Sequence, residues 1–322
     1  MIILIVGAGI IGSIYGWALS KAGHDVTHLV RPGKSQQLAK GIPIDLLDSR
    51  KGYVKQYIGL YALKVTETLS LSDGFELVIV PTKPYQVEDA LKQITPYTDK
   101  ADYLLLTQNW NGTTAIDSIL PQFRYVYGDA KAGGSLQNGT LISAIFPTID
   151  LGQVNGQKDN CLTKTTALFE SIGVKPNLQD NILHYIWVQY AINAGLWPAL
   201  VRAGGLEALL HDRRTGDLSL FAVKECLEVA ARRGVDLKKY PDARMYSNTS
   251  FIARQITGFI LRLLFRFNQS VQRSSAHALA DPQEIKMSFY DLLNTGRELG
   301  VDMPIMSNFE SDIIRFADSH RN

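Results

Sequence analysis

The sequence predicts a doubly wound α/β domain over residues 1–178, followed by an all-α domain over residues 179–322. Three observations support this fold class. The chain begins with a short apolar run that is followed at once by closely spaced glycines. Apolar, strand-like runs then alternate with helical patterns to about residue 178, and helical periodicity alone continues from there to the end.

The composition is that of a globular protein with an ordinary core. The chain has 322 residues, of which 46% are hydrophobic and 20% are charged, so disordered and low-complexity classes are excluded. A net charge of +2 argues against a surface that binds nucleic acid as a whole. The two cysteines, Cys161 and Cys226, lie far apart without a partner motif. They predict neither a disulfide framework nor a metal site, and the cytoplasm is the expected compartment.

The first element is an apolar run over residues 1–6 that predicts a buried parallel strand rather than a signal peptide, because no basic segment precedes it. A helical pattern to Gly23 and a second strand over Asp25–Val30 complete a β-α-β unit. The intervening turn has the pattern G-x-G-x-x-G. Its glycines permit a tight turn, a close approach to a pyrophosphate and close helix packing, which predicts a Rossmann-type dinucleotide site. The predicted cofactor-binding residues of this turn are Gly7, Ala8, Gly9, Ile10, Ile11 and Gly12.

The end of the second strand indicates which nicotinamide cofactor is used. An NAD site favours a carboxylate there, which accepts hydrogen bonds from the ribose hydroxyls. This chain instead has Arg31, with Lys34 close behind it. A guanidinium and an ammonium suit a 2′-phosphate, so the sequence favours NADP(H), although a solvated surface pair is the alternative interpretation.

The remaining elements follow in βαβα order. Strands are predicted at 75–81, 103–107 and 124–127, with helices at 85–94 and 112–120. The Gly-rich stretch 128–156 predicts antiparallel strands appended to this sheet, followed by a helix at 158–171 and a short strand near Val174. The helices predicted after that cover 181–202, 206–211, 217–233, 244–273 and 281–300.

Several of these residues together resemble the ketopantoate reductase family, whose members use NADPH to reduce 2-dehydropantoate to pantoate. The resemblance covers almost the full length and implies a role in pantothenate biosynthesis. Beyond the glycine turn and Arg31, it is carried by residues 80–87 (VPTKPYQV), Gln108-Asn109, Trp187, 191–193 (AIN), Pro198 and Glu284-Ile285.

The resemblance implies a role for four polar residues. Lys83 and Asn109 match positions that line the nicotinamide cleft, where Asn109 also reaches the substrate. Asn193 matches a position that hydrogen-bonds the substrate, and Glu284 matches a carboxylate that orients the substrate hydroxyl or the catalytic ammonium. From the residues alone, Lys83 could be a loop lysine and Asn109 a helix cap, while Asn193 could be a packing amide and Glu284 a first-turn helix residue.

The chain departs from the family at the catalytic lysine, whose position is occupied by Gln189. An ammonium stabilises and protonates the alkoxide formed on reduction, whereas an amide can only donate a hydrogen bond. Trp197 replaces a second substrate-contacting asparagine, and Trp110 replaces a glycine. His184 and Tyr190 lie on other faces of the same helix, so Lys83 is the better candidate for the proton donor. The predicted catalytic residues are Lys83, Gln189 and Glu284, and the predicted substrate contacts are Asn109, Asn193, Trp197 and Glu284.

Two function classes follow from these residues. The first is an NADPH-dependent reductase of a small 2-oxo acid or related carbonyl, and the second is an NADP-binding or sensor protein that has lost the chemistry. An opine-type imine reductase is a weaker third option, because no His–Asp pair is placed to support it.

Residues 251–273 form a basic amphipathic segment with no acidic residue, since none occurs between Asp242 and Asp281. Its arginines fall on one arc of a helical wheel, and its apolar side chains fill the opposite side. The segment predicts a peripheral membrane helix or an anionic-partner surface, a packed helix of the second domain, or part of a homodimer interface. The arginines are Arg254, Arg262, Arg266 and Arg273.

Overall fold

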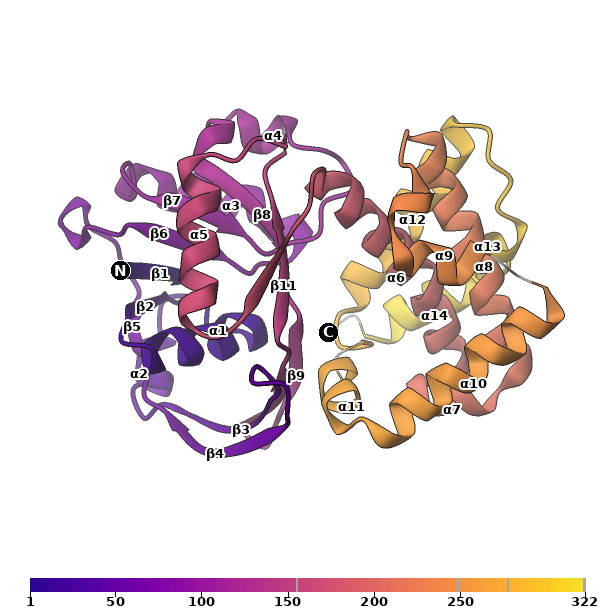
Figure 1. Cartoon of the computed structure of the whole chain (residues 1–322), viewed down its shortest axis with the longest axis horizontal. Helices are drawn as coiled ribbons and strands as arrows, with labels where there is room; N and C mark the ends of the chain where they lie inside the picture. Colours follow the sequence, from indigo (N-terminus) through magenta and orange to yellow (C-terminus); the bar gives the residue numbers. More distant parts are fainter. Residues whose placement is uncertain (155, 248–249, 277, 321–322) are drawn as a thin grey trace. The chain divides into compact units, whose positions relative to one another are not determined.

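The computed structural model describes residues 1–154, 156–247, 250–276 and 278–320, and it divides the chain into two compact units (Figure 1). The first unit comprises Met1–Leu183 together with Ser270–Ala276. The second comprises His184–Gln269 and His277–Asn322. A short segment of the helical half of the sequence therefore belongs to the first unit.

The first unit is built on an eight-stranded sheet in the order β12-β11-β8-β7-β6-β1-β2-β5. Neighbouring strands are parallel except β11, which runs antiparallel to β8. The predicted doubly wound α/β class is confirmed. The strands are β1 (Ile2–Val6), β2 (Asp25–Leu29), β5 (Lys64–Thr66), β6 (Leu77–Val80), β7 (Asp102–Leu105), β8 (Tyr125–Asp129), β11 (Thr148–Gly152) and β12 (Lys175–Leu178).

The central strands are apolar on both faces because helices cover the sheet, and all four residues of β6 are buried. Helix α1 directly follows β1, as the glycine turn predicts. The predicted helix 112–120 is only one turn long, since the chain forms α-helix over Thr114–Asp117 alone. The helices of this unit are α1 (Ile10–Lys21), α2 (Ser35–Leu38), α3 (Val87–Ile94), α4 (Thr114–Asp117) and α5 (Asn160–Ser171).

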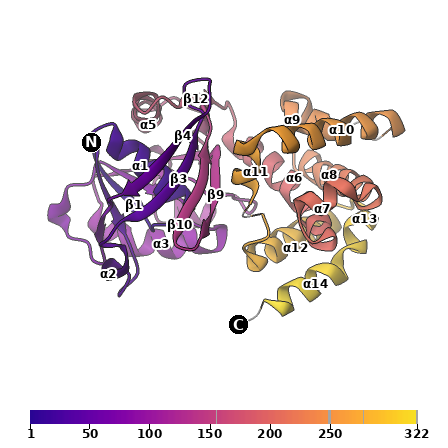
Figure 2. The same cartoon turned by 90° about the horizontal axis from the view of Figure 1, so that it is seen from below.

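A second, four-stranded sheet in the order β4-β3-β10-β9 corrects the expectation that residues 128–156 only extend the main sheet (Figure 2). Only β11 extends it, whereas β10 pairs in parallel with β3, a strand that the sequence reading missed. Both sheets contact α1, which buries Tyr15 and Leu19 completely. The strands are β3 (Ile42–Asp48), β4 (Lys55–Tyr61), β9 (Ala132–Gln137) and β10 (Thr140–Ile145).

The second unit is helical, as predicted, and α6 is its longest element. The predicted helix 244–273 is instead divided into α9, α10 and α11. Most of α11 belongs to the first unit, where the Arg273 guanidinium lies 2.7 Å from the Asp45 carboxylate of β3. The helices are α6 (Ile182–Ala203), α7 (Leu206–His211), α8 (Arg213–Arg232), α9 (Pro241–Ser247), α10 (Phe251–Phe267), α11 (Gln269–Ser275), α12 (Pro282–Glu298), α13 (Pro304–Asn308) and α14 (Glu310–Ser319).

Helix α10 turns a row of large apolar side chains to solvent rather than into a core. Phe259 is 62% exposed and Phe267 is 72% exposed, with Ile256, Ile260, Leu263 and Leu264 also exposed. The structure therefore does not support the interpretation of this segment as a packed core helix. The side chains of residues 251–254, including the predicted Arg254, lie outside the described residues. Among the helices described, none is both long and apolar enough to cross a bilayer.

Candidate active site

The glycine turn between β1 and α1 has the shape that a pyrophosphate requires. Gly7 has φ +89°, which side chains disfavour, and a Cβ added to Gly9 would have no neighbour within 4 Å. A Cβ on Gly12 would come within 3.0 Å of Ile5 on β1, so this glycine allows α1 to lie close to the sheet. No side chain caps the start of α1, and its first turn contains no acidic residue. Its first N–H groups therefore point toward an open, positively polarised site.

A buried histidine is hydrogen-bonded to this turn. The Nδ1 of His28 on β2 donates to the carbonyl oxygen of Gly7 at 2.8 Å, and its Nε2 accepts from the hydroxyl of Tyr61 at 2.9 Å. Burial lowers the pKa of His28, which keeps the ring neutral with one donor and one acceptor nitrogen. Gly16 leaves room for this pair, since a Cβ there would lie 2.5 Å from the His28 ring. The sequence reading missed this role, because His28 looks like an ordinary strand residue.

The turn after β2 carries the predicted phosphate-binding pair. Arg31 and Lys34 are both exposed, and the Lys34 ammonium donates to the Gln37 side chain at 3.0 Å. Glu67, which follows β5, accepts a hydrogen bond from the backbone N–H of Ser35 at 2.9 Å. Hydrogen bonds from the Ser35 side chain and from the backbone of Ser35 and Gly33 lower the pKa of Glu67. Glu67 thus anchors the turn that presents the two cations.

Lys83 and Asn109 follow neighbouring parallel strands, β6 and β7, at the carboxyl edge of the main sheet. This edge is where ligands bind in open α/β folds, and β1 with its glycine turn is the next strand. The Asn109 amide nitrogen donates to the Gly112 carbonyl at 2.7 Å and to the Tyr127 hydroxyl at 2.8 Å. Since both amide hydrogens are used, the carbonyl oxygen of Asn109 is the atom left for a ligand.

Two buried polar atoms also lie near the carboxyl edge of the main sheet. The Thr82 hydroxyl and the Gln108 side-chain oxygen are buried and have no hydrogen-bond partner in the described structure. Each directly precedes a predicted site residue, Lys83 or Asn109, at the end of its strand. Buried polar atoms of this kind are normally satisfied, so a bound molecule with polar groups fits here. Sequence reasoning assigned no role to Thr82 or Gln108, although polar residues that end apolar strands were a usable signal.

Three predicted residues of the second unit form one stripe along α6, since Gln189, Asn193 and Trp197 are spaced four residues apart. The Gln189 amide donates to the Asp242 carboxylate at the start of α9, at 2.8 Å. Asn193 is half-buried, and its side chain makes no hydrogen bond within the part of the chain that the structure describes. The alternative of a hydrogen-bonded packing amide at Asn193 is therefore not supported.

Other polar residues of the helical unit have structural contacts. The hydroxyl of Tyr190, which is 1% exposed, donates to the Asp291 carboxylate at 2.6 Å. Burial and the charge of Asp291 raise the pKa of Tyr190 far above its ordinary value, so its hydroxyl is a poor proton donor. His184 stacks on Trp187 at 5.5 Å between ring centres. Glu284 is in the first turn of α12, where its backbone N–H donates to the cap residue Asp281 at 3.0 Å.

Comparisons with known proteins identify relatives of this chain. The model of the family described as "Ketopantoate reductase PanE/ApbA" matches residues 3–128. A 2-dehydropantoate 2-reductase of Pyrococcus abyssi is 26% identical over 258 residues, covering 75% of this chain and 77% of the relative. The uncharacterized oxidoreductase YkpB of Bacillus subtilis is 31% identical over 237 residues, covering 69% of this chain and 75% of the relative.

Solved structures share the fold over the whole chain. A 2-dehydropantoate 2-reductase from Geobacter metallireducens has a TM-score of 0.73 at 17% identity, covering 98% of this chain and 99% of that one. The ternary structure of D-mandelate dehydrogenase with NADH and anilino(oxo)acetate has a TM-score of 0.71 at 17% identity and covers 99% of both chains. Fold, glycine turn and relatives together define an oxidoreductase built from a Rossmann-type unit and a helical unit. Within that class, the chain belongs to the ketopantoate reductase family.

Proposed function

We propose that this protein uses NADPH to reduce the carbonyl of a small 2-oxo acid, or of a related compound, to a hydroxyl group. The observation that carries the proposal is the placement of Lys83 and Asn109 after β6 and β7, next to the uncapped glycine turn after β1. If the acid is 2-dehydropantoate, the protein acts in pantothenate biosynthesis. We expect it to work in the cytoplasm.

Each residue of the proposed site has its own role in the reduction. When bound, the nicotinamide supplies a hydride to the carbonyl carbon. Lys83 stabilises the negative charge that develops on the carbonyl oxygen and gives it a proton. The free carbonyl oxygen of Asn109 accepts a hydrogen bond from the cofactor or the substrate. Gln189, Asn193, Trp197 and Glu284 are proposed substrate contacts, with Gln189 able to donate a hydrogen bond but not a proton.

The direct test is a panel of 2-oxo acids, including 2-dehydropantoate, with NADPH oxidation followed by absorbance. We expect turnover with at least one member of the panel. NADPH binding measured by calorimetry, without oxidation by any member, would contradict the reductase proposal. It would support the second candidate, an NADP-binding or sensor protein, which is favoured by the glutamine at position 189 and its bond to Asp242.

The charge at the turn after β2 predicts the cofactor preference. We expect Arg31→Ala to weaken NADPH binding about 10- to 100-fold, because the guanidinium that contacts the 2′-phosphate is lost. NADH has no 2′-phosphate, so its binding should not change. Glu67→Gln removes a negative charge beside this turn but keeps an oxygen that can accept from the Ser35 N–H, so it is expected to strengthen NADPH binding. Titration of each variant with both cofactors, followed by nicotinamide fluorescence, is the measurement. Equal losses for NADPH and NADH in Arg31→Ala would refute the proposed phosphate site.

The site around Gln189 predicts that restoring the family lysine is not sufficient. In Gln189→Lys the new ammonium would face Asp242, and Trp197 would still occupy the position of the second asparagine. We expect 2-dehydropantoate reduction to rise far less than the roughly 100-fold that a positioned general acid supplies. The double variant Gln189→Lys with Trp197→Asn should show the larger gain. Full activity in the single variant would show that Trp197 does not restrict the substrate.

We also propose that α10 joins two copies of the chain in a homodimer. Ile256, Ile260, Leu263 and Phe267 are all exposed and are spaced by four, three and four residues, which is the seam by which paired helices pack. The guanidinium of Arg262, beside this seam, already has a partner within the second unit, since it donates to the Leu210 carbonyl at 2.6 Å. An uncharged apolar seam suits a second copy better than an anionic partner.

Light scattering coupled to size-exclusion chromatography tests this proposal. We expect a dimer that becomes a monomer in the double variant Ile260→Ser with Leu263→Ser. Leu71→Ser with Ile314→Ser removes two other exposed apolar side chains and should leave the dimer intact. A monomeric wild-type protein that sediments with anionic lipid vesicles would overturn the dimer in favour of a peripheral membrane helix.

A further inference from the structure

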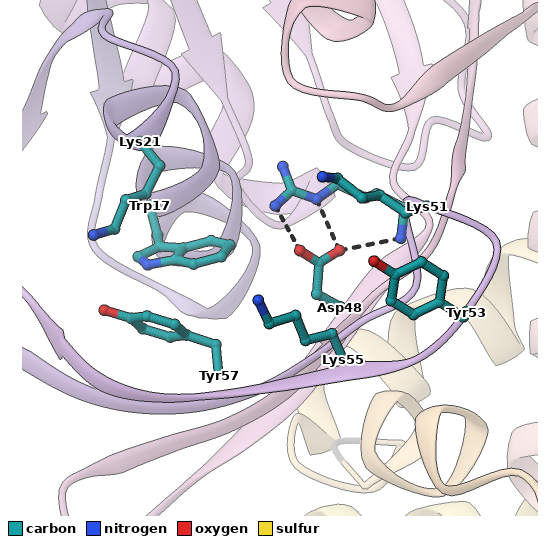
Figure 3. A pocket seen from close by; sticks show the side chains of 8 residues that line it. Trp17, Lys21, Asp48, Lys51, Tyr53, Lys55 and Tyr57 are labelled. Carbon is teal, nitrogen blue, oxygen red and sulfur yellow. Dashed lines mark hydrogen bonds and ion pairs between the residues drawn. The ribbon is translucent and has the colours of Figure 1, made fainter.

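A pocket lies in the first unit, between the C-terminal half of α1 and the β3–β4 hairpin (Figure 3). It has a volume of about 370 Å³ and is lined by α1, by the ends of β3 and β4, and by the turn between them. None of its residues is a predicted site residue. The glycine turn precedes the N-terminus of α1, whereas this pocket borders Lys21 at the C-terminus of the same helix. The pocket is therefore separate from the proposed cofactor site.

The pocket carries an excess of positive charge. Four cations line it, against the single carboxylate of Asp48, which leaves three net positive charges. That carboxylate is already used, because it accepts from Arg50 Nε at 2.9 Å and from Arg50 Nη2 at 2.7 Å. Burial raises the pKa of Asp48, but the hydrogen bonds from Arg50 outweigh this and lower it below its usual range. Asp48 thus stays charged and fixes the position of the Arg50 guanidinium at the side of the pocket.

The other three cations are less firmly paired: the charge of Lys51 helps to lower the pKa of Asp48, and the Lys21 ammonium lies 5.6 Å from the centre of the Tyr57 ring. In the described part of the chain, the ammonium groups of Lys21, Lys51 and Lys55 form neither an ion pair nor a hydrogen bond. All three are exposed, and Lys55 rises from β4 into the space between Trp17 and Asp48 (Figure 3). Like charges gathered in a concave site repel one another and attract an anion. Three lysines that share one carboxylate, already bonded to Arg50, are suited to a ligand that brings more negative charge.

Aromatic rings form the rest of the pocket wall. Trp17 is 5% exposed, and its ring lies 5.0 Å from that of Tyr57 and 5.4 Å from the guanidinium of Arg50. The buried indole N–H of Trp17 has no hydrogen-bond partner among the described residues. Tyr53 is 60% exposed and lies across the pocket from Trp17 (Figure 3). An aromatic wall with exposed cations at its rim fits a compact molecule with several acidic groups.

We propose that this pocket binds a small organic polyanion, with at least two phosphate or carboxylate groups, at a site distinct from the cofactor. Lys51 and Lys55 bind the acidic groups, and the Trp17–Tyr57 wall contacts the body of the molecule. The site does not depend on the proposed reductase activity, since none of its residues takes part in that reaction.

The test is calorimetric titration at low salt with two probes, inorganic pyrophosphate and citrate, in the presence of saturating NADPH. NADPH occupies the glycine turn, so that pyrophosphate bound there is not counted. We expect saturable binding that weakens about 10- to 100-fold in the double variant Lys51→Ala with Lys55→Ala. Binding of pyrophosphate alone would identify a phosphate ligand, and binding of citrate alone would identify a carboxylate ligand.

The matched control is Lys100→Ala with Lys158→Ala, which removes two exposed lysines elsewhere in the first unit and changes the net charge equally. This control should bind both probes as the wild type does. Equal weakening in the two double variants would show a nonspecific charge effect and overturn the proposal. Failure of both probes to bind the wild type would also overturn it. Thermal melting of each variant confirms that these exposed substitutions leave the fold intact.

Discussion

Replacing Lys83 with alanine is expected to lower kcat by about 10²- to 10⁴-fold, the range that a positioned general acid contributes. The reason is its place after the carboxyl end of β6, beside the glycine turn, combined with the proposal that Gln189 stands at the family's lysine position. The affinity for NADPH should change little, because the glycine turn and Arg31 supply most of the proposed contacts. Steady-state kinetics with the active 2-oxo acid and a separate cofactor titration measure the two effects.

A matched lysine and a conservative replacement sharpen this experiment. Lys100→Ala removes an exposed lysine from the turn before β7, at the opposite edge of the sheet from Lys83, and should leave kcat unchanged. Lys83→Arg keeps the positive charge but loses an easily donated proton, so it should retain stabilisation of the alkoxide and lose the wild-type pH profile. A Lys83→Ala enzyme with kcat within a few-fold of wild type would exclude Lys83 as the proton donor. Another group would then have to act as the proton donor.

A second large effect is expected for Gly195→Ala, which should destabilise the helical unit by about 3 kcal/mol. Gly195 lies where α6 crosses α8, and a Cβ added there would come within 2.6 Å of the backbone nitrogen and Cα of Val223. Backbone atoms cannot rotate away as a flexible side chain can, so the two helices must separate. We expect thermal unfolding to shift down by roughly 10 °C in calorimetry.

Gly258→Ala is the control for this effect. Gly258 is also a helical glycine of the second unit, but a Cβ added to it would meet no atom within 4 Å. Alanine favours the helix by about 0.5–1 kcal/mol relative to glycine, so this variant should melt at the same temperature or slightly higher. If Gly195→Ala melted like Gly258→Ala, the close approach of α6 and α8 would not exist in solution.

Local patterns were sufficient to predict the cofactor turn and the strand-end residues. The spacing of Gly7, Gly9 and Gly12 matches their separate roles in the structure, because each role depends on a few neighbouring residues. Lys83 and Asn109 were predicted because the short motifs around them resemble those of the family. Parallel strands put their carboxyl ends on one edge, so sequence order alone brings these residues to neighbouring positions.

Long-range pairing was not predictable in the same way. The sheet that joins β3 and β4 to β9 and β10 combines segments about a hundred residues apart, and no local pattern specifies that β10 pairs with β3. The pocket between α1 and the β3–β4 hairpin depends on this sheet, because the sheet brings Lys55 of β4 opposite Trp17 of α1. The carboxylate of Glu67 was missed for a related reason, because it reaches the Arg31 turn only through the pairing of β5 with β2.

The amino-acid sequence alone was enough to predict the α/β and all-α halves, the cofactor turn and the family. These properties depend on residue type and on short spacing, which are visible in one dimension. Only the tertiary structure decided which polar atoms are already used, as with Asn109 and Tyr127, and which are not, as with Thr82. It alone also decided that the apolar face of α10 is exposed. Helical periodicity shows that a helix has an apolar face, whereas burial depends on what the rest of the chain places against it.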